Sequence, residues 1–146
     1  MLLLAWVSAA SAERLAVSVS IANIRSGPGE NYDILWAVEK YHPLNVFQKS
    51  GQWYHFRDFE GDEGWIHKTL LDKFSSVITK TENCNIRSGP DTSFEVLFEV
   101  EKGIPFKVLE HKGSWIHIQH ADGDKGWIHE FLVCYNRVKQ IKVINR

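Results

Sequence analysis

The chain has 146 residues, of which 17 are Lys or Arg and 18 are Asp or Glu, so its formal net charge at pH 7 is −1. Such a balance provides no global field that would attract nucleic acid or anionic lipid, and we predict no nucleic-acid partner. Hydrophobic residues make up 44% of the chain and charged residues 24%, as in an ordinary globular protein.

The first twelve residues, MLLLAWVSAASA, are a short apolar run followed by small residues that end in A-S-A. This pattern fits a signal peptide with its cleavage site, so we predict a signal peptide over residues 1–12 and a periplasmic or secreted protein. A buried N-terminal strand is the alternative. No other segment approaches the roughly 18 apolar residues that span a bilayer, so we predict no membrane span.

The hexapeptide NIRSGP occurs at residues 23–28 and again at 85–90, an offset of 85 minus 23, or 62 residues. The match continues without a gap to Leu70 and Leu132, which indicates two copies of one module. We assign residues 13–73 to a first domain and 74–135 to a second. The segment between the repeats includes Val77-Ile78-Thr79, which resembles a strand more than a flexible tether, so we expect the two domains to dock closely.

Within each copy, turn signals recur every 8 to 12 residues, as in Ser26-Gly27-Pro28-Gly29 and Glu60-Gly61-Asp62. Val, Ile, Phe, Tyr and Trp lie between them, a pattern that predicts short antiparallel strands curled into a barrel or sandwich. No segment has a 3.6-residue period. Residues 66–71 form at most one helical or 3₁₀ turn.

Residues 53–57 (WYHFR) and 115–119 (WIHIQ) alternate between two faces. The second and fourth residues of each segment are apolar and are expected to face the core, which leaves Trp and His outside. The next strand contains Trp-Ile-His in each copy, so its Trp and His share the outer face if the hairpins turn at Gly61 and Gly123. The outer face is then predicted to carry Trp53, His55, Trp65 and His67, with Trp115, His117, Trp127 and His129 in the second copy.

The ordered set N-I-R-S-G-P, E-K, G-x-W and G-D-x-G-W-I-H, present twice, resembles the bacterial Src-homology-3-like (SH3b) family. The resemblance covers roughly residues 20–73 and 82–134. It implies an all-β fold of two consecutive small SH3-like β-barrels, closely docked, in a protein of the cell envelope. Members of the family commonly act as non-catalytic binding modules, and some recognise peptidoglycan. The partner implied is a cell-wall peptide or an envelope protein.

The resemblance also suggests a ligand groove on each copy. Together with the outward face of the hairpin, it gives these candidate ligand-binding residues: Tyr32, Trp53, His55 and His67 in the first copy, and Phe94, Trp115, His117 and His129 in the second. The alternative for the tryptophans is partial burial that caps a small barrel. In the corresponding alternative function, the chain is a structural or adaptor protein that binds another envelope protein and has no small ligand.

Other chemistry has weaker support in the sequence. The paired histidines would supply only two ligands to a zinc ion, and the third candidates, Asp58 and His120, are not matched between copies. We therefore predict no metal and no cofactor. We also predict no enzyme activity, because no nucleophile, base and orienting group occur together. Arg25 and Arg87 could bind a carboxylate, but bonding to the carbonyls of their own loops is the simpler interpretation.

In an SH3-like barrel, the strands that carry Cys84 and Cys134 would be neighbours, so the resemblance predicts a disulfide between these two residues. The basic tail, 136–146, is interpreted as an extra strand or a partner-docking segment, and a solvated disordered tail is equally compatible with it.

Overall fold

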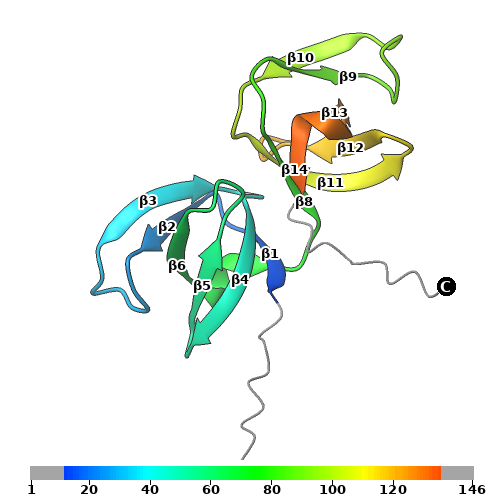
Figure 1. Ribbon diagram of the computed structural model, residues 1–146. Helices are drawn as coiled ribbons and strands as arrows, with labels where there is room; N and C mark the ends of the chain where they lie inside the picture. Colours follow the sequence, from blue (N-terminus) through cyan, green and yellow to red (C-terminus); the bar gives the residue numbers. More distant parts are fainter. Residues whose placement is uncertain (1–11, 136–146) are drawn as a thin grey trace, which may run out of the picture.

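The computed structural model describes residues 12–135, in which every regular element is a β-strand or a short 3₁₀ turn (Figure 1). The tail at 136–146 and the segment assigned as a signal peptide, apart from Ala12, lie outside the described residues. No helix in the described part of the chain is long and apolar enough to cross a membrane.

The first domain consists of seven strands and one 3₁₀ turn. These elements are β1 (Glu13–Val17), β2 (Ile21–Arg25), β3 (Ile34–Glu39), β4 (Pro43–Ser50), β5 (Trp53–Arg57), β6 (Glu63–His67), η1 (Lys68–Leu70) and β7 (Leu71–Asp72). The strands pair antiparallel in the order β3-β2-β6-β5-β4-β1-β7.

The second domain repeats this arrangement. Its elements are β8 (Ser76–Thr79), β9 (Cys84–Arg87), β10 (Val96–Val100), β11 (Pro105–Lys112), β12 (Trp115–Gln119), β13 (Lys125–His129), η2 (Glu130–Leu132) and β14 (Val133–Tyr135). The order β10-β9-β13-β12-β11-β8-β14 reproduces that of the first sheet. The all-β prediction is confirmed. In the described chain the two outer strands of each sheet are not paired with each other, so each sheet is open.

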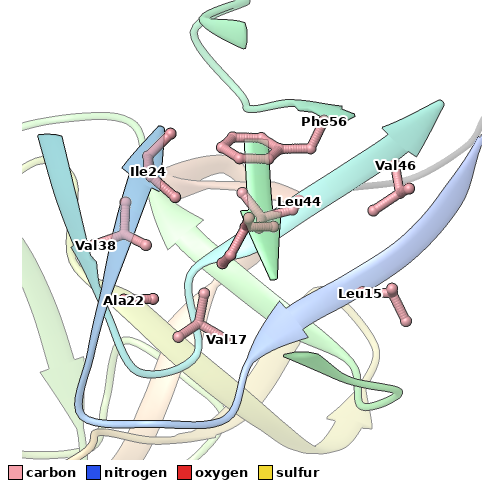
Figure 2. Close-up of a cluster of buried hydrophobic side chains, with 9 residues drawn as sticks. Leu15, Val17, Ala22, Ile24, Val38, Leu44, Val46 and Phe56 are labelled. Atoms are coloured by element: carbon pink, nitrogen blue, oxygen red, sulfur yellow. The ribbon is translucent and has the colours of Figure 1, made fainter. Parts of the chain in front are cut away.

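Each domain has its own hydrophobic core. In the first, inward side chains from β1, β2, β4 and β5 meet, with Phe56, Ile24 and Leu44 fully buried (Figure 2). In the second, Phe106, Ile86 and Ile116 are fully buried. The two clusters share no residue. Each small domain therefore relies on its own buried area for stability.

The hexapeptide closes a loop in each domain. Arg25 Nη1 donates to the carbonyl oxygens of Glu30 at 2.9 Å and Tyr32 at 3.0 Å, and Arg87 makes the same two bonds in the second loop. The simpler interpretation of the arginines is thus confirmed. Gly27 does not have a positive φ. It is required because a Cβ there would overlap the Tyr32 ring.

The segment between the sheets is short, since only residues 73–75 separate β7 from β8. The strand prediction for residues 77–79 is confirmed by β8. The Phe74 ring lies edge-on to Tyr41, with centroids 5.4 Å apart, and the Lys107 Nζ lies 5.9 Å from its centroid. A second link between the domains is the ion pair of Glu60 and Lys102, at 3.7 Å. The linker therefore contacts both domains.

The predicted disulfide is wrong, because Cys84 and Cys134 are free thiols. Cys134 lies on β14 opposite Ile78 of β8, whereas Cys84 lies on β9, between β10 and β13. The first strand of the second sheet is β8, which precedes Cys84 in the chain. The two cysteines consequently lie on strands near opposite ends of the sheet. Cys84 Sγ lies 3.1 Å from the Thr81 carbonyl oxygen instead.

Candidate functional site

The outer face of the β5–β6 hairpin carries the tryptophans and histidines that alternation assigned to it. Trp53 lies opposite His67 and His55 lies opposite Trp65, while Phe56 on the other face is fully buried. The β12–β13 hairpin has the same register. Gly61 and Gly123, with φ of 86° and 98°, occupy the left-handed region at the two turns. The predicted faces of both hairpins are therefore confirmed.

Trp53 and His67 form an edge-to-face pair, with ring centroids 5.1 Å apart and planes at 90°. Trp115 and His129 have the same geometry, at 5.1 Å and 88°. All four side chains are half-buried. An edge-to-face arrangement is favourable because the positive edge of one ring meets the negative face of the other. The repeat thus builds the same aromatic pair twice.

Each of these histidines also begins a 3₁₀ turn. His67 Nδ1 accepts a hydrogen bond from the Thr69 backbone N–H at 3.3 Å, and His129 Nδ1 accepts from the Phe131 N–H at 3.2 Å. Since a backbone N–H can only donate, Nδ1 must be unprotonated, and in the neutral ring the hydrogen is on Nε2. The turn therefore fixes both the orientation and the tautomer of the imidazole.

The second pair on each hairpin is stacked in parallel. The His55 and Trp65 centroids are 4.4 Å apart with planes at 6°, and those of His117 and Trp127 are 4.7 Å apart at 11°. Burial lowers the pKa of His55, with Glu63 opposing this effect and Arg57 adding to it. In the first domain Phe47 extends the stack, 4.4 Å from His55.

Phe47 reaches this face because the β4–β5 register shifts between Val46 and Gln48. Such a bulge redirects one side chain relative to simple alternation. Leu109 occupies the equivalent shift in β11. The sequence pattern alone did not identify Phe47 as part of the outer face.

A pocket of 240 Å³ lies on the second domain. Its lining residues are Asn83, Asn85, Arg87, Thr92, Trp115, His129 and Leu132. Of the predicted site residues, the pocket brings together Trp115 and His129. His117 is stacked on Trp127, and Phe94 packs over Gly89, so neither lines it.

Asn83, Asn85 and Thr92 were not identified from the sequence as site residues. Phe131, beside these positions, is 72% exposed and stacked on His129 with centroids 5.0 Å apart. A comparison of the two copies contains a signal for two of these positions. Thr69 and Ile21 occupy the places of Phe131 and Asn83 in the first repeat, so the copies diverge beside the shared Trp–His pair.

The tryptophans of the outer faces do not line the cavity between the domains. That cavity, of 320 Å³, is lined by residues of both domains, among them Trp36, His42, Phe59, Ile78 and Pro105. With both domains present, Trp53 and Trp115 are half-buried and keep part of their surface accessible. Among the described residues, no group of three or more His, Cys, Asp or Glu side chains is arranged to hold a metal ion.

Comparison with known proteins identifies the family to which this chain belongs. The bacterial SH3 domain model matches residues 18–73 and 80–133. The protein of Bacillus subtilis strain 168 named "Putative N-acetylmuramoyl-L-alanine amidase YrvJ" is 29% identical over 133 residues, 84% of this chain and 25% of that protein. The "Probable cell wall amidase LytH" of Staphylococcus epidermidis RP62A is 43% identical over 60 residues, 40% of this chain and 21% of that protein.

This chain therefore spans about a quarter or less of the length of these relatives. Among solved structures, NlpC2 from Trichomonas vaginalis aligns with 94% of this chain and 53% of its own, with a TM-score of 0.40 and 16% identity. An NlpC/P60 family protein from Bacillus cereus aligns with 86% of this chain and 57% of its own, with a TM-score of 0.41 and 14% identity. This chain is similar to parts of a protein named as a putative N-acetylmuramoyl-L-alanine amidase and of one named as a probable cell wall amidase. Since the family model covers most of both repeats, the chain belongs to the bacterial SH3 domain family and carries two such domains.

Proposed function

We propose that this chain is a non-catalytic module that binds cell-wall peptides outside the cytoplasm, through the surfaces around Trp53 and His67 and around Trp115 and His129. The observation that carries the proposal is the repetition of one half-buried Trp–His pair, with the same ring geometry, on the outer face of both domains. A Trp kept accessible at the same place in two copies is well suited to ligand contact.

The pair has the physical properties of a peptide-binding surface. Indole and imidazole rings combine a large apolar area with a polar edge, so they can bury an aliphatic side chain and still bond to a peptide group. The 3₁₀ turn already fixes the imidazole through Nδ1, so little side-chain entropy remains to be lost on binding. This structural use of the histidines favours binding over proton transfer as their role.

The relatives support the cell wall as the place where this chain binds. The names of the two amidases refer to the cell wall or to a muramoyl-alanine bond, and this chain matches only part of each protein. We carry over to this chain the wall-binding setting and not the amidase activity. Localisation outside the cytoplasm belongs to the same proposal.

Co-sedimentation with purified peptidoglycan sacculi tests the proposal. The full chain should sediment with sacculi, and the double variant Trp53→Leu/Trp115→Leu should remain largely in the supernatant. Leucine keeps an apolar side chain, and near-ultraviolet circular dichroism would verify the fold. If the wild-type chain stays in the supernatant, or if the double variant sediments equally well, the proposal is wrong.

A second candidate function, as an adaptor for another envelope protein, is favoured by the exposed apolar residues of the edge strands. Ile34 and Leu35 on β3 are 53% and 50% exposed, and Leu97 on β10 is 48% exposed. Edge strands with exposed apolar side chains can accept a further strand. The repeat-matched variant Leu35→Ala/Leu97→Ala therefore serves as the control: it should bind sacculi normally, whereas an adaptor role predicts loss of a protein partner.

A further inference from the structure

The pocket of the second domain combines a mostly apolar lining with several groups that can donate hydrogen bonds. The Trp115 indole N–H and the Arg87 guanidinium can only donate. His129 accepts at Nδ1 from the Phe131 N–H, which places its hydrogen on Nε2, so the neutral ring is also a donor on its other side. The Asn83 and Asn85 amides at the same pocket can both donate and accept. Because the Arg87, Trp115 and His129 groups are donors, a complementary ligand group supplies acceptor atoms.

Arg87 keeps donors for such a group. Its two hydrogen bonds to the loop, to the carbonyl oxygens of Thr92 and Phe94 at 3.0 Å each, both use Nη1. The bonds fix the guanidinium in place, and Nε and Nη2 remain as donors. A fixed guanidinium binds a carboxylate more strongly than a flexible ammonium does, because less entropy is lost for each bond.

No acidic residue lines the pocket. Two acids are neighbours of lining residues in the chain. The Asp91 carboxylate accepts from Thr92 Oγ1 at 3.2 Å and from the Ser93 N–H at 3.4 Å, and Glu130 follows His129 at the start of η2. Since neither carboxylate lines the pocket, its interior offers one cation without an anion.

We propose that this pocket binds the free C-terminal carboxylate of a short peptide, with a small apolar side chain of that peptide lying against Trp115 and Leu132. The inference rests on the proposed function, since it names the part of a wall peptide that the second domain recognises. The carboxylate oxygens accept from Arg87 and from the indole and imidazole N–H groups. The volume of 240 Å³ holds about one small terminal residue.

The first domain lacks this specificity, because the repeat places different residues at two lining positions. Arg25 bonds to the Glu30 carbonyl oxygen as Arg87 bonds to that of Thr92, so Glu30 occupies the place of Thr92. A carboxylate at that position repels a second one. Ile21, which is 70% exposed, replaces Asn83 and removes an amide donor. The two surfaces therefore share an aromatic pair and differ in the ligand group that they accept.

The test is an NMR titration of the full chain, labelled with ¹⁵N, that follows the indole N–H signals of Trp53 and Trp115. The probes are N-acetyl-glycyl-alanine with a free carboxylate and the same dipeptide as its C-terminal amide. We expect the acid to move the Trp115 signal and the amide to bind about tenfold more weakly, which corresponds to one charge-assisted hydrogen bond. The Trp53 signal should respond much less to the acid.

Two variants at one exposed position separate the effect of a negative charge from the effect of side-chain size. Thr92→Glu installs the residue of the first domain. It should bind the acid about tenfold more weakly than Thr92→Gln, whose side chain has nearly the same size as that of Glu but no charge. Equal binding of acid and amide, an equal response of Trp53, or equal effects of the two variants would overturn the inference. If sacculi bind the chain but the acid does not move Trp115, this inference fails and the proposed function stands. If the acid binds and sacculi do not, the proposed function fails while the specificity of the pocket remains.

Discussion

The Trp115 indole meets the His129 imidazole edge to face, and the same imidazole accepts a hydrogen bond from the Phe131 backbone N–H. One side chain thus orients an aromatic neighbour and begins a 3₁₀ turn. The packing of the ring against the indole serves the first role, and the Nδ1 acceptor serves the second. These roles can be separated by substitution.

We predict that His129→Asn retains most of the stability of the domain and weakens wall binding. Asn is a favourable capping residue whose side-chain oxygen can accept from the Phe131 N–H, whereas His129→Ala loses the cap and should cost about 1 kcal/mol in the free energy of unfolding. Chemical denaturation and co-sedimentation with sacculi measure the two effects. Wild-type binding by His129→Asn would show that the ring has no role in recognition.

The separate cores predict that the domains unfold independently. Phe56→Ala should lower the stability of the first domain by about 3–5 kcal/mol, because it removes a fully buried ring. Ile118→Ala, at the equivalent position in the second repeat, should destabilise only the second domain. Hydrogen exchange resolved by residue checks this: faster exchange of β12 amides in Phe56→Ala would contradict independence.

The contact of Gly27 with the Tyr32 ring predicts a strong coupling between the two positions. Gly27→Ala should destabilise the first domain by about 1–3 kcal/mol, because the added Cβ would overlap the ring. In a Tyr32→Ala background the same substitution should cost much less. Thermal unfolding of the four proteins of this double-mutant cycle gives the coupling energy, and additive effects would exclude the contact as the cause.

His42 predicts a loss of stability in mild acid. Its Nε2 is buried without a hydrogen-bond partner among the described residues, and burial lowers its pKa to about 4, from 6.5. Because the unfolded chain takes up the proton first, stability is complete above pH 6.5 and falls as the pH drops towards 4. Between pH 7 and pH 5 the loss from this group is about 2 kcal/mol.

The control for this effect is His42→Ile, which installs the residue found at the equivalent position, Ile104. Burial raises the pKa of Asp58, which lines the same cavity. Protonation of Asp58 therefore increases the stability as the pH falls, which opposes the effect of His42. Urea denaturation at both pH values should show a smaller loss for His42→Ile than for the wild type. An identical loss in the two proteins would remove His42 as its source.

Much of the fold follows from the duplication in the sequence. Two copies of one pattern fixed which residues of the hairpins face outward, because Ile116 and Ile118 in one copy identify the core face that Tyr54 and Phe56 leave ambiguous in the other. The local role of Arg25 was also predictable, since a guanidinium beside a tight turn has carbonyl groups within reach.

Features that depend on strand order were not predictable in the same way. The pairing of Cys84 with Cys134 failed because the second sheet begins at β8, before Cys84. The position of Phe47 depends on a register shift, which leaves no mark on the alternation of residues. The pocket depends on Asn83 and Thr92, which approach Trp115 only once the sheet has curled.

The three-residue linker between β7 and β8 has a consequence for affinity. Three extended residues span about 10 Å, so once one domain holds a wall strand, the other domain samples only the volume around it. Its binding becomes intramolecular, at an effective concentration on the order of millimolar. Two individually weak surfaces can then give long residence on a polymer that repeats its own chemistry, while a single soluble fragment of that polymer dissociates quickly.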